Sequence, residues 1–167
     1  MLFNILSSLL SSSPAHALNI GDQIPPIEAK NQDGKIVKLG ELKGQFVLLY
    51  FYPADETPGC TKEACTLRDH YDKIKAMNAV VYGISRQDEK SHKKFIAHNK
   101  LPFDLLVDSD GHISKAFGVA AVLNYNDRSS FLVDPSGKII KTYPNVDPSK
   151  HAEEIVADLK AASGKVE

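Results

Sequence analysis

Cys60 and Cys65 are the only cysteines in the chain, and their setting favours thiol redox chemistry. They follow an unbroken apolar run at residues 46–52 and stand at the start of a segment with helical spacing. Two cysteines are too few for a disulfide scaffold, and no Cys-x-x-Cys pair or Cys/His cluster indicates a structural zinc site. We therefore expect a reactive thiol, with neither a metal nor a cofactor.

The residues before Cys60 place it in the first turn of a helix. Thr57 fits the N-cap, where its side chain can accept a hydrogen bond from a first-turn amide, and Pro58 fits the first helical position. Cys60 then lies among free backbone N–H groups at the positive end of the helix dipole, which favours a thiolate. The alternative is a small buried hydrophobic residue. Because ionisation also weakens the nucleophile, fast chemistry requires a cationic donor from elsewhere in the chain.

The spacing of the two cysteines predicts a movement. On an intact helix, residues five apart have Cα atoms roughly 8.6 Å apart. A disulfide requires Cα atoms within about 7 Å of each other. A bond between Cys60 and Cys65 therefore requires the first turns of the helix to unwind.

The remaining sequence supplies alternating strands and helices. We expect a hairpin at residues 27–39, strands at 46–52, 79–84 and 103–107, helices at 57–77, 88–99, 112–117 and 148–162, and a second hairpin from 130–133 and 138–143. This order predicts an α/β fold with a mixed central sheet and helices on both faces. Ligands of such sheets gather beyond the carboxyl ends of the strands, where Cys60 falls.

Composition indicates one globular domain without a polyanionic partner. The chain has 167 residues, 43% of them hydrophobic, and twenty basic residues against twenty-one acidic ones. This balance offers no general attraction to nucleic acid or an anionic membrane.

Residues 1–17 carry no charged side chain and end in Ala15-His16-Ala17, which resembles a secretory leader cut before Leu18. We expect an exported domain at residues 18–167; the alternative is an unstructured tail on a cytoplasmic enzyme.

The segment from Pro53 to Cys65 resembles the peroxiredoxin motif, specifically that of the bacterioferritin comigratory protein and peroxiredoxin Q group. It has Pro-x-x-x-Thr-x-x-Cys at Pro53, Thr57 and Cys60, with a second cysteine five positions later. Residues 101–103, 108–111 and 128–134 are also similar to that group, and the resemblance covers residues 18–159. It implies a thioredoxin-like fold and a thiol peroxidase that reduces hydrogen peroxide and organic hydroperoxides.

The resemblance also implies unequal roles for the two cysteines. Cys60 would be the peroxidatic residue, whose thiolate attacks the peroxide and becomes a sulfenic acid. Cys65 would resolve this acid into an intramolecular disulfide. A thioredoxin-like or glutaredoxin-like protein would then reduce the disulfide, and we expect a monomer.

Four further residues receive roles from the same resemblance. The Thr57 hydroxyl would hold the peroxide, Pro53 would shield the sulfur from water, and Arg128 would stabilise the thiolate and polarise the O–O bond. Glu63 would orient Arg128. From the residues alone, Arg128 could be a solvated surface charge and Glu63 a favourable first-turn acid. We expect the six histidines to lie on the surface.

The sequence departs from the group at Ala54, where a lysine is frequent, and at residues 85–88, which lack the usual Ser-x-Asp.

Two alternative functions use the same cysteines. A thioredoxin-like disulfide reductase or oxidase normally requires Cys-x-x-Cys, which this chain lacks. A non-enzymatic redox sensor could signal through the Cys60–Cys65 disulfide.

Overall fold

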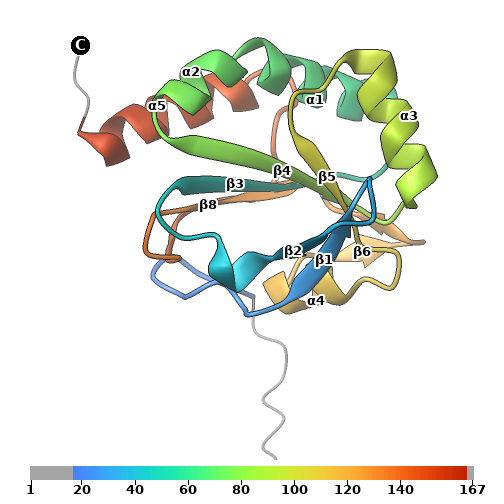
Figure 1. Ribbon diagram of the computed structural model, residues 1–167, viewed down its shortest axis with the longest axis horizontal. Helices are drawn as coiled ribbons and strands as arrows, with labels where there is room; N and C mark the ends of the chain where they lie inside the picture. The colour runs from blue at the N-terminus through green and yellow to red at the C-terminus, as the bar shows by residue number, and fades with distance from the viewer. Residues whose placement is uncertain (1–16, 165–167) are drawn as a thin grey trace, which may run out of the picture.

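The computed structural model describes residues 17–164, which form one mixed sheet between two layers of helices (Figure 1). The expected leader lies outside these residues, except for Ala17. No helix among residues 17–164 is long and apolar enough to span a membrane. The strands are β1 (Glu28–Asn31), β2 (Ile36–Lys38), β3 (Phe46–Phe51), β4 (Ala79–Ser85), β5 (Asp104–Val107), β6 (Ala121–Val122), β7 (Tyr125–Asn126), β8 (Ser129–Val133) and β9 (Ile139–Tyr143). The helices are α1 (Pro58–Asp69), α2 (Tyr71–Ala76), α3 (Glu89–Asn99), α4 (His112–Phe117) and α5 (His151–Ser163), with a 3₁₀ turn at Leu39–Glu41.

The seven-stranded sheet has the order β2-β1-β5-β4-β3-β8-β9. Strand β4 pairs in parallel with β3 and β5, whereas the remaining pairs are antiparallel. All six residues of β3 are buried, as expected for a continuous apolar run at the centre of a sheet. The prediction of a mixed α/β sheet with an N-terminal hairpin is confirmed.

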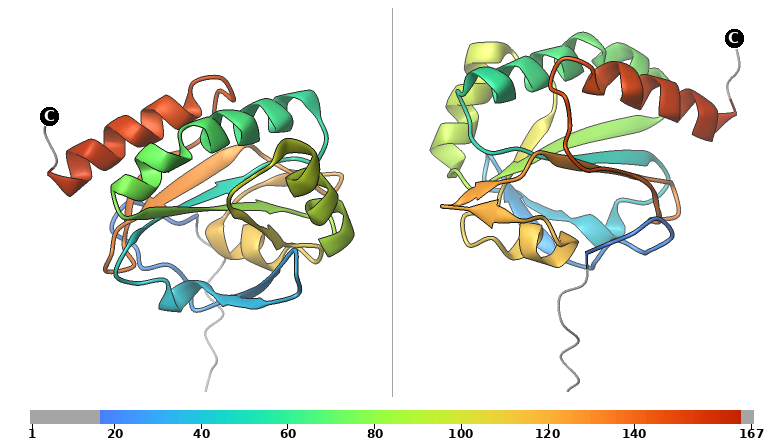
Figure 2. Two further views of the ribbon diagram at one scale, coloured as in Figure 1. Left: turned by 45° about the horizontal axis from the view of Figure 1, so that its top comes forward. Right: turned by 180° about the vertical axis from the view of Figure 1, so that it is seen from behind.

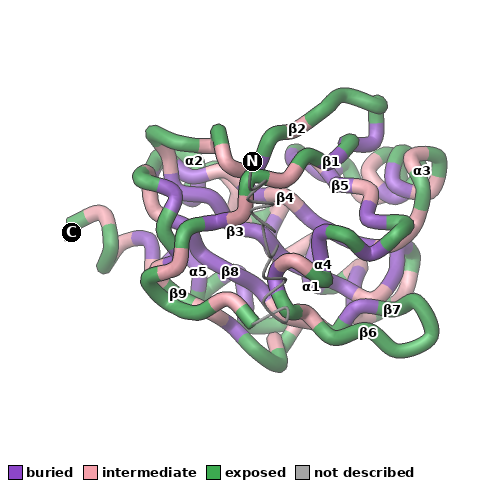
Figure 3. The backbone as a smooth tube through the Cα atoms, turned by 90° about the horizontal axis from the view of Figure 1, so that it is seen from below, coloured by how far each residue is buried: buried purple, intermediate pink, exposed green. Residues whose placement is uncertain are grey.

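The central sheet separates two hydrophobic cores. Helices α1, α2, α3 and α5 lie on one face and α4 on the other, as both views of Figure 2 show. Side chains of β3 alternate between the cores, so that Leu48 and Tyr50 face the larger helical layer while Leu49 and Phe51 face α4. In Figure 3 the buried stretches concentrate on β3 and β8. The site described below lies on the side of the larger helical layer.

The single helix predicted at residues 57–77 is wrong, because the chain bends at His70 and forms α1 and α2. His70 has φ −99° and ψ 1°, and its ring Nδ1 lies 2.8 Å from the carbonyl oxygen of Thr66. A side chain that competes for a helical carbonyl favours such a break. Leu67 and Ile74, on either side of the bend, are both fully buried, so both short helices pack on the sheet.

A third, smaller hairpin, formed by β6 and β7, was not predicted. Strands β6 and β7 are joined through Leu123 and Asn124, whose φ angles are 49° and 69°. A two-residue hairpin with positive φ at both loop positions usually carries glycine, asparagine or aspartate. Leucine at the first position gives no such signal, which explains why the pattern was missed.

Candidate active site

Cys60 lies at the N-terminus of α1, just beyond the carboxyl end of β3. Thr57 is the N-cap with φ −84° and ψ 150°, and Pro58 begins the helix. Only 1% of Cys60 is exposed. The position predicted from the Thr-Pro-Gly-Cys spacing is therefore the observed one, and the positive end of the helix dipole is directed at the sulfur.

The predicted capping bond of Thr57 is wrong. Its side chain makes no cap hydrogen bond, and the hydroxyl instead donates to the carbonyl oxygen of Ala54 over 2.9 Å. The loop before the helix takes a turn that brings this carbonyl within reach of the hydroxyl. Because its proton is used inside the loop, the Thr57 oxygen is left as a hydrogen-bond acceptor. Pro53 lies half-buried earlier in the same loop.

Arg128 supplies the cation that Cys60 requires. Its Nη2 donates to Cys60 Sγ over 3.4 Å, and its Nη1 donates to Glu63 Oε2 over 2.5 Å. Strand β8 pairs with β3 so that Ser129 lies opposite Phe51, which brings the preceding Arg128 to the end of β3. A Cβ atom at Gly59 would lie 3.1 Å from Arg128 Nη2. Glycine at this position therefore allows the guanidinium to approach the sulfur.

Burial sets the charge states of this cluster. The side chain of Glu63 is fully buried, and this burial raises its pKa to about 7, although the neighbouring Arg128 opposes the shift. Burial alone would lower the pKa of Arg128, but Glu63 and Cys60 raise it above its ordinary value. Arg128 therefore remains a cation, whereas Glu63 changes its charge near neutral pH.

Cys65 lies in the same unbroken helix, α1, but in different surroundings. It is half-buried, and its Sγ lies 3.6 Å from Oδ1 of Asn99, the last residue of α3. Arg68 Nη1 donates to the backbone oxygen of Asn99 over 2.7 Å and fixes α3 against α1. Both cysteines are free thiols. The structure thus brings Cys60, Arg128 and Glu63 together and leaves Cys65 in a separate contact with α3.

The prediction that all six histidines lie on the surface is wrong for His92 and His151, which are fully buried. His151 Nε2 lies 2.9 Å from the hydroxyl oxygen of Ser130, close to Arg128 in the chain. Burial lowers the pKa of His151 to about 4, although Asp158 opposes the shift, so the ring is neutral near pH 7. His92 stands three residues before the buried Phe95, and that helical spacing was the signal for an inward-facing histidine.

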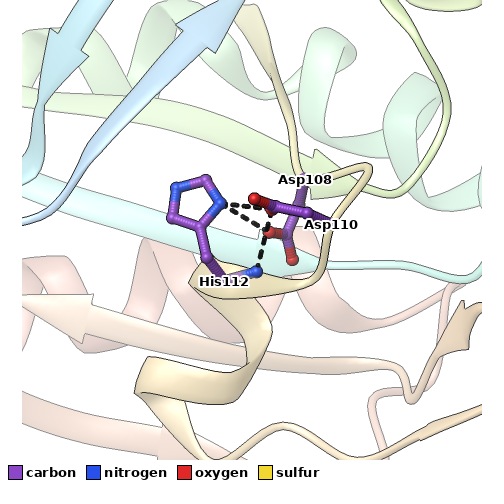
Figure 4. Close-up of side chains that lie close together, drawn as sticks. All are labelled: Asp108, Asp110 and His112. Atoms are coloured by element: carbon purple, nitrogen blue, oxygen red, sulfur yellow. Dashed lines mark hydrogen bonds and ion pairs between the residues drawn. The ribbon is translucent and has the colours of Figure 1, made fainter.

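Asp108, Asp110 and His112 form the one cluster in the described residues with ligand spacing for a metal, their ligand atoms lying within 4.8 Å (Figure 4). These groups already have protein partners. His112 Nδ1 contacts Asp110 Oδ1 at 2.5 Å and its Nε2 lies 2.8 Å from the Glu28 carbonyl oxygen. Burial would lower the pKa of His112, but these two contacts raise it, which favours an imidazolium cation rather than a metal ligand.

A cysteine at a helix N-terminus, facing an arginine and beyond the central strands of a mixed sheet, defines the class of thiol-dependent redox enzymes. Residues 20–142 match the AhpC/TSA family. Over 155 residues the chain is 39% identical to "Peroxiredoxin Bcp" of Bacillus subtilis, covering 89% of this chain and 99% of the relative. It is 43% identical to "Peroxiredoxin Q, chloroplastic" of Arabidopsis thaliana, covering 95% of this chain and 74% of the relative.

Solved structures agree with these relatives. A mutant of Xylella fastidiosa PrxQ superimposes with a TM-score of 0.83 at 31% identity, covering 89% of this chain and 99% of that one. The peroxidoxin BcpB of Mycobacterium tuberculosis gives a TM-score of 0.81 at 32% identity, covering 87% and 98%. The chain belongs to the AhpC/TSA family and, within it, to the Bcp and peroxiredoxin Q group of thiol peroxidases. This confirms the family and the peroxidase activity expected from the sequence.

Proposed function

We propose that Cys60 reduces hydrogen peroxide and organic hydroperoxides through a sulfenic acid. The observation that carries this assignment is the 3.4 Å contact between Arg128 Nη2 and Cys60 Sγ. The thiolate attacks one peroxide oxygen, the O–O bond breaks, and the leaving oxygen takes its electron pair and a proton to form water or an alcohol. Arg128 stabilises the thiolate before the attack and the charge that develops on the leaving oxygen during it.

Thr57 and Pro53 complete the peroxide site in this proposal. Since the Thr57 hydroxyl donates to Ala54, it can accept a hydrogen bond from the O–H of a peroxide. The half-buried ring of Pro53 limits access of water to the sulfur. Glu63 accepts from Nη1 of Arg128, whereas Cys60 accepts from Nη2, and the Glu63 contact thus fixes the direction of the guanidinium. These contacts support the roles given to the four residues by the family resemblance.

Cys65 is the resolving residue of the proposed cycle. Its thiol attacks the Cys60 sulfenic acid, the S–S bond forms, and water leaves. Both cysteines belong to the intact helix α1, so the first turns must unwind before their sulfurs can meet. A dithiol protein of the thioredoxin or glutaredoxin type then reduces the disulfide by exchange and becomes oxidised itself.

We further propose that the protein acts as an exported monomer. The charge-free residues 1–17, with Ala15 and Ala17 before a cleavage point at Leu18, support export. Sequencing the amino terminus of the native protein tests this proposal: Leu18 is expected, and an intact Met1 would remove the leader.

Peroxide consumption with a thioredoxin system and with a generic thiol tests the assignment of the two cysteines. Cys60→Ser is expected to abolish activity with either reductant. Cys65→Ser is expected to form the sulfenic acid, detected by mass spectrometry after trapping, but to lose turnover with thioredoxin. Full peroxidase activity in Cys60→Ser would overturn the proposal.

A further inference from the structure

The loop that carries Pro53 and Thr57 is held by a buried carboxylate outside α1. The side chain of Asp55 is 1% exposed. Its Oδ1 accepts from the hydroxyl of Tyr52 over 2.6 Å, and its Oδ2 accepts from the hydroxyl of Ser91 over 2.7 Å. Its backbone N–H donates to Gln87 Oε1 over 3.1 Å. The loop is thus tied to the segment after β4 and to the first turn of α3.

His92 completes this network as the partner of Asp55. Its ring is fully buried, with Nδ1 2.7 Å from Asp55 Oδ2 and Nε2 3.0 Å from the carbonyl oxygen of Leu106 in β5. The ring thus bridges the loop carboxylate and strand β5. Each nitrogen of the His92 ring, and each side-chain oxygen of Asp55, has a partner within the buried network.

The loop needs such support because its backbone is strained. Glu56, between Asp55 and Thr57, has φ 61°, a left-handed conformation that residues other than glycine rarely adopt. Such conformations persist where surrounding contacts over-determine them. The next residue, Thr57, donates its hydroxyl back to Ala54, so the position of this hydroxyl depends on the same strained turn.

We propose that Asp55 and His92 are a positioning pair that fixes the Pro53–Thr57 loop for peroxide binding. The inference rests on the proposed function of Cys60, and it extends the site to residues that do not touch the sulfur. The side-chain partners of Asp55 are Tyr52, directly before the loop, and Ser91 and His92 in α3, and none belongs to α1. The loop is therefore held in place while the first turns of α1 unwind, and the peroxide site can re-form when the disulfide is reduced.

Two reactions of Cys60 separate positioning from general reactivity. Peroxide oxidation requires Thr57 and Pro53 in place, whereas alkylation by iodoacetamide requires mainly an accessible thiolate. In the full chain, the double variant Asp55→Asn/His92→Gln replaces both ionisable groups together, so that neither is left buried without its partner. We expect the peroxide rate constant to fall at least tenfold, since small misplacements of binding groups are costly, and the alkylation rate constant to change less than about twofold.

A second variant and a matched control complete the experiment. Ser91→Ala removes one hydrogen bond from Asp55 and keeps both Asp55 and His92, so it should lower the peroxide rate about two- to fivefold. His98→Gln removes a contact of 2.8 Å between the same helix and the same loop, to Glu56, but this pair is 54% and 40% exposed. It should leave both rates unchanged.

Each outcome has a definite meaning. The positioning role is overturned if the ratio of the peroxide rate to the alkylation rate is unchanged in Ser91→Ala and in the folded double variant. This includes the case in which both rates fall by the same factor. If the double variant does not fold, Ser91→Ala alone decides. Failure of the proposed function has a different signature, because wild type itself would then show no oxidation of Cys60 by peroxide.

Discussion

Cys60 and Cys65 share one helix but not one environment. Cys60 lies in the first turn of α1, almost fully buried, with the Arg128 guanidinium 3.4 Å from its sulfur. Cys65 is half-buried further along α1 and faces Asn99 at the C-terminal end of α3. The first site combines the positive end of a helix with a cation, and the second meets the negative end of a helix and an amide oxygen. The same residue type is thus paired with a cationic donor in one place and with an amide oxygen in the other.

The comparison also explains why the two thiols remain apart until oxidation. Cys60 is held by Arg128, which precedes β8, and Cys65 by the end of α3. Neither partner belongs to α1. Joining the sulfurs must therefore break one contact at each cysteine in addition to the hydrogen bonds of the first helical turns.

The largest expected effect comes from removing the cation beside Cys60. Arg128→Met should lower the rate of Cys60 oxidation by about 10²–10³-fold, the usual cost of losing one donor to a developing oxyanion. The variant can still fold, because Glu63, with a pKa of about 7, takes a proton when its partner is lost. Rapid mixing with hydrogen peroxide, followed by acid quench and mass spectrometry, measures this rate.

Arg68→Met is the matched control for Arg128→Met. Arg68 lies beside Cys65 and binds the end of α3, far along α1 from the peroxide site. Its loss should change the rate of Cys60 oxidation less than about threefold, because a partly exposed arginine at the far end of α1 contributes little to a distant step. If both variants lost the same factor in the rate of Cys60 oxidation, the two cysteines could not be said to lie in different environments.

Glu63 provides the second largest effect, in the pH dependence of stability. In the folded protein Glu63 keeps its proton up to about pH 7, whereas its ordinary pKa is 4.5. Folding therefore binds a proton between these values, and linkage makes the protein lose stability as the pH rises through this window. From the difference of the two values, 7 minus 4.5, the loss is on the order of 3 kcal/mol at about 1.4 kcal/mol per unit.

Glu63→Gln should remove this dependence. The free energy of unfolding of Glu63→Gln, measured in urea, should increase relative to that of wild type from pH 4.5 to pH 8, because only wild type loses stability over this range. Glu153→Gln, at an exposed position in the first turn of α5, should follow wild type throughout. A constant difference between Glu63→Gln and wild type across this range would show that Glu63 remains ionised beside Arg128.

The third effect concerns the movement that joins the two cysteines. Forming the Cys60–Cys65 disulfide should accelerate amide exchange in residues 57–67 at least about tenfold, because the first turns of α1 lose their hydrogen bonds. Exchange in α5 should remain unchanged. Equal protection of residues 57–67 in the reduced and oxidised proteins would refute the coupling between the disulfide and local unwinding.

The sequence predicts the parts of this comparison that depend on local signals. Residues 57–60 place Cys60 in the first turn of a helix, and the apolar run at residues 46–52 predicts the central strand before it. Arg128 was reached only through the family motif, because strand pairing over 68 positions brings it to Cys60. The Asp55–His92 pair and the contact of Cys65 with Asn99 were missed for the same reason. Each joins segments more than thirty positions apart, which local spacing does not relate.

The smallest expected effect lies at Cys65. Asn99→Ala removes the oxygen that faces its thiol, and should raise the rate of disulfide formation about two- to fivefold, since a weak S–H donor contributes less than an ordinary hydrogen bond. The rate of Cys60 oxidation should not change, because Asn99 touches only the second cysteine. Asn99→Asp retains an acceptor at this position and should show no acceleration. Following the sulfenic acid and the disulfide separately by mass spectrometry distinguishes the steps. An effect of Asn99→Ala on the first step would mean that α3 controls both cysteines together.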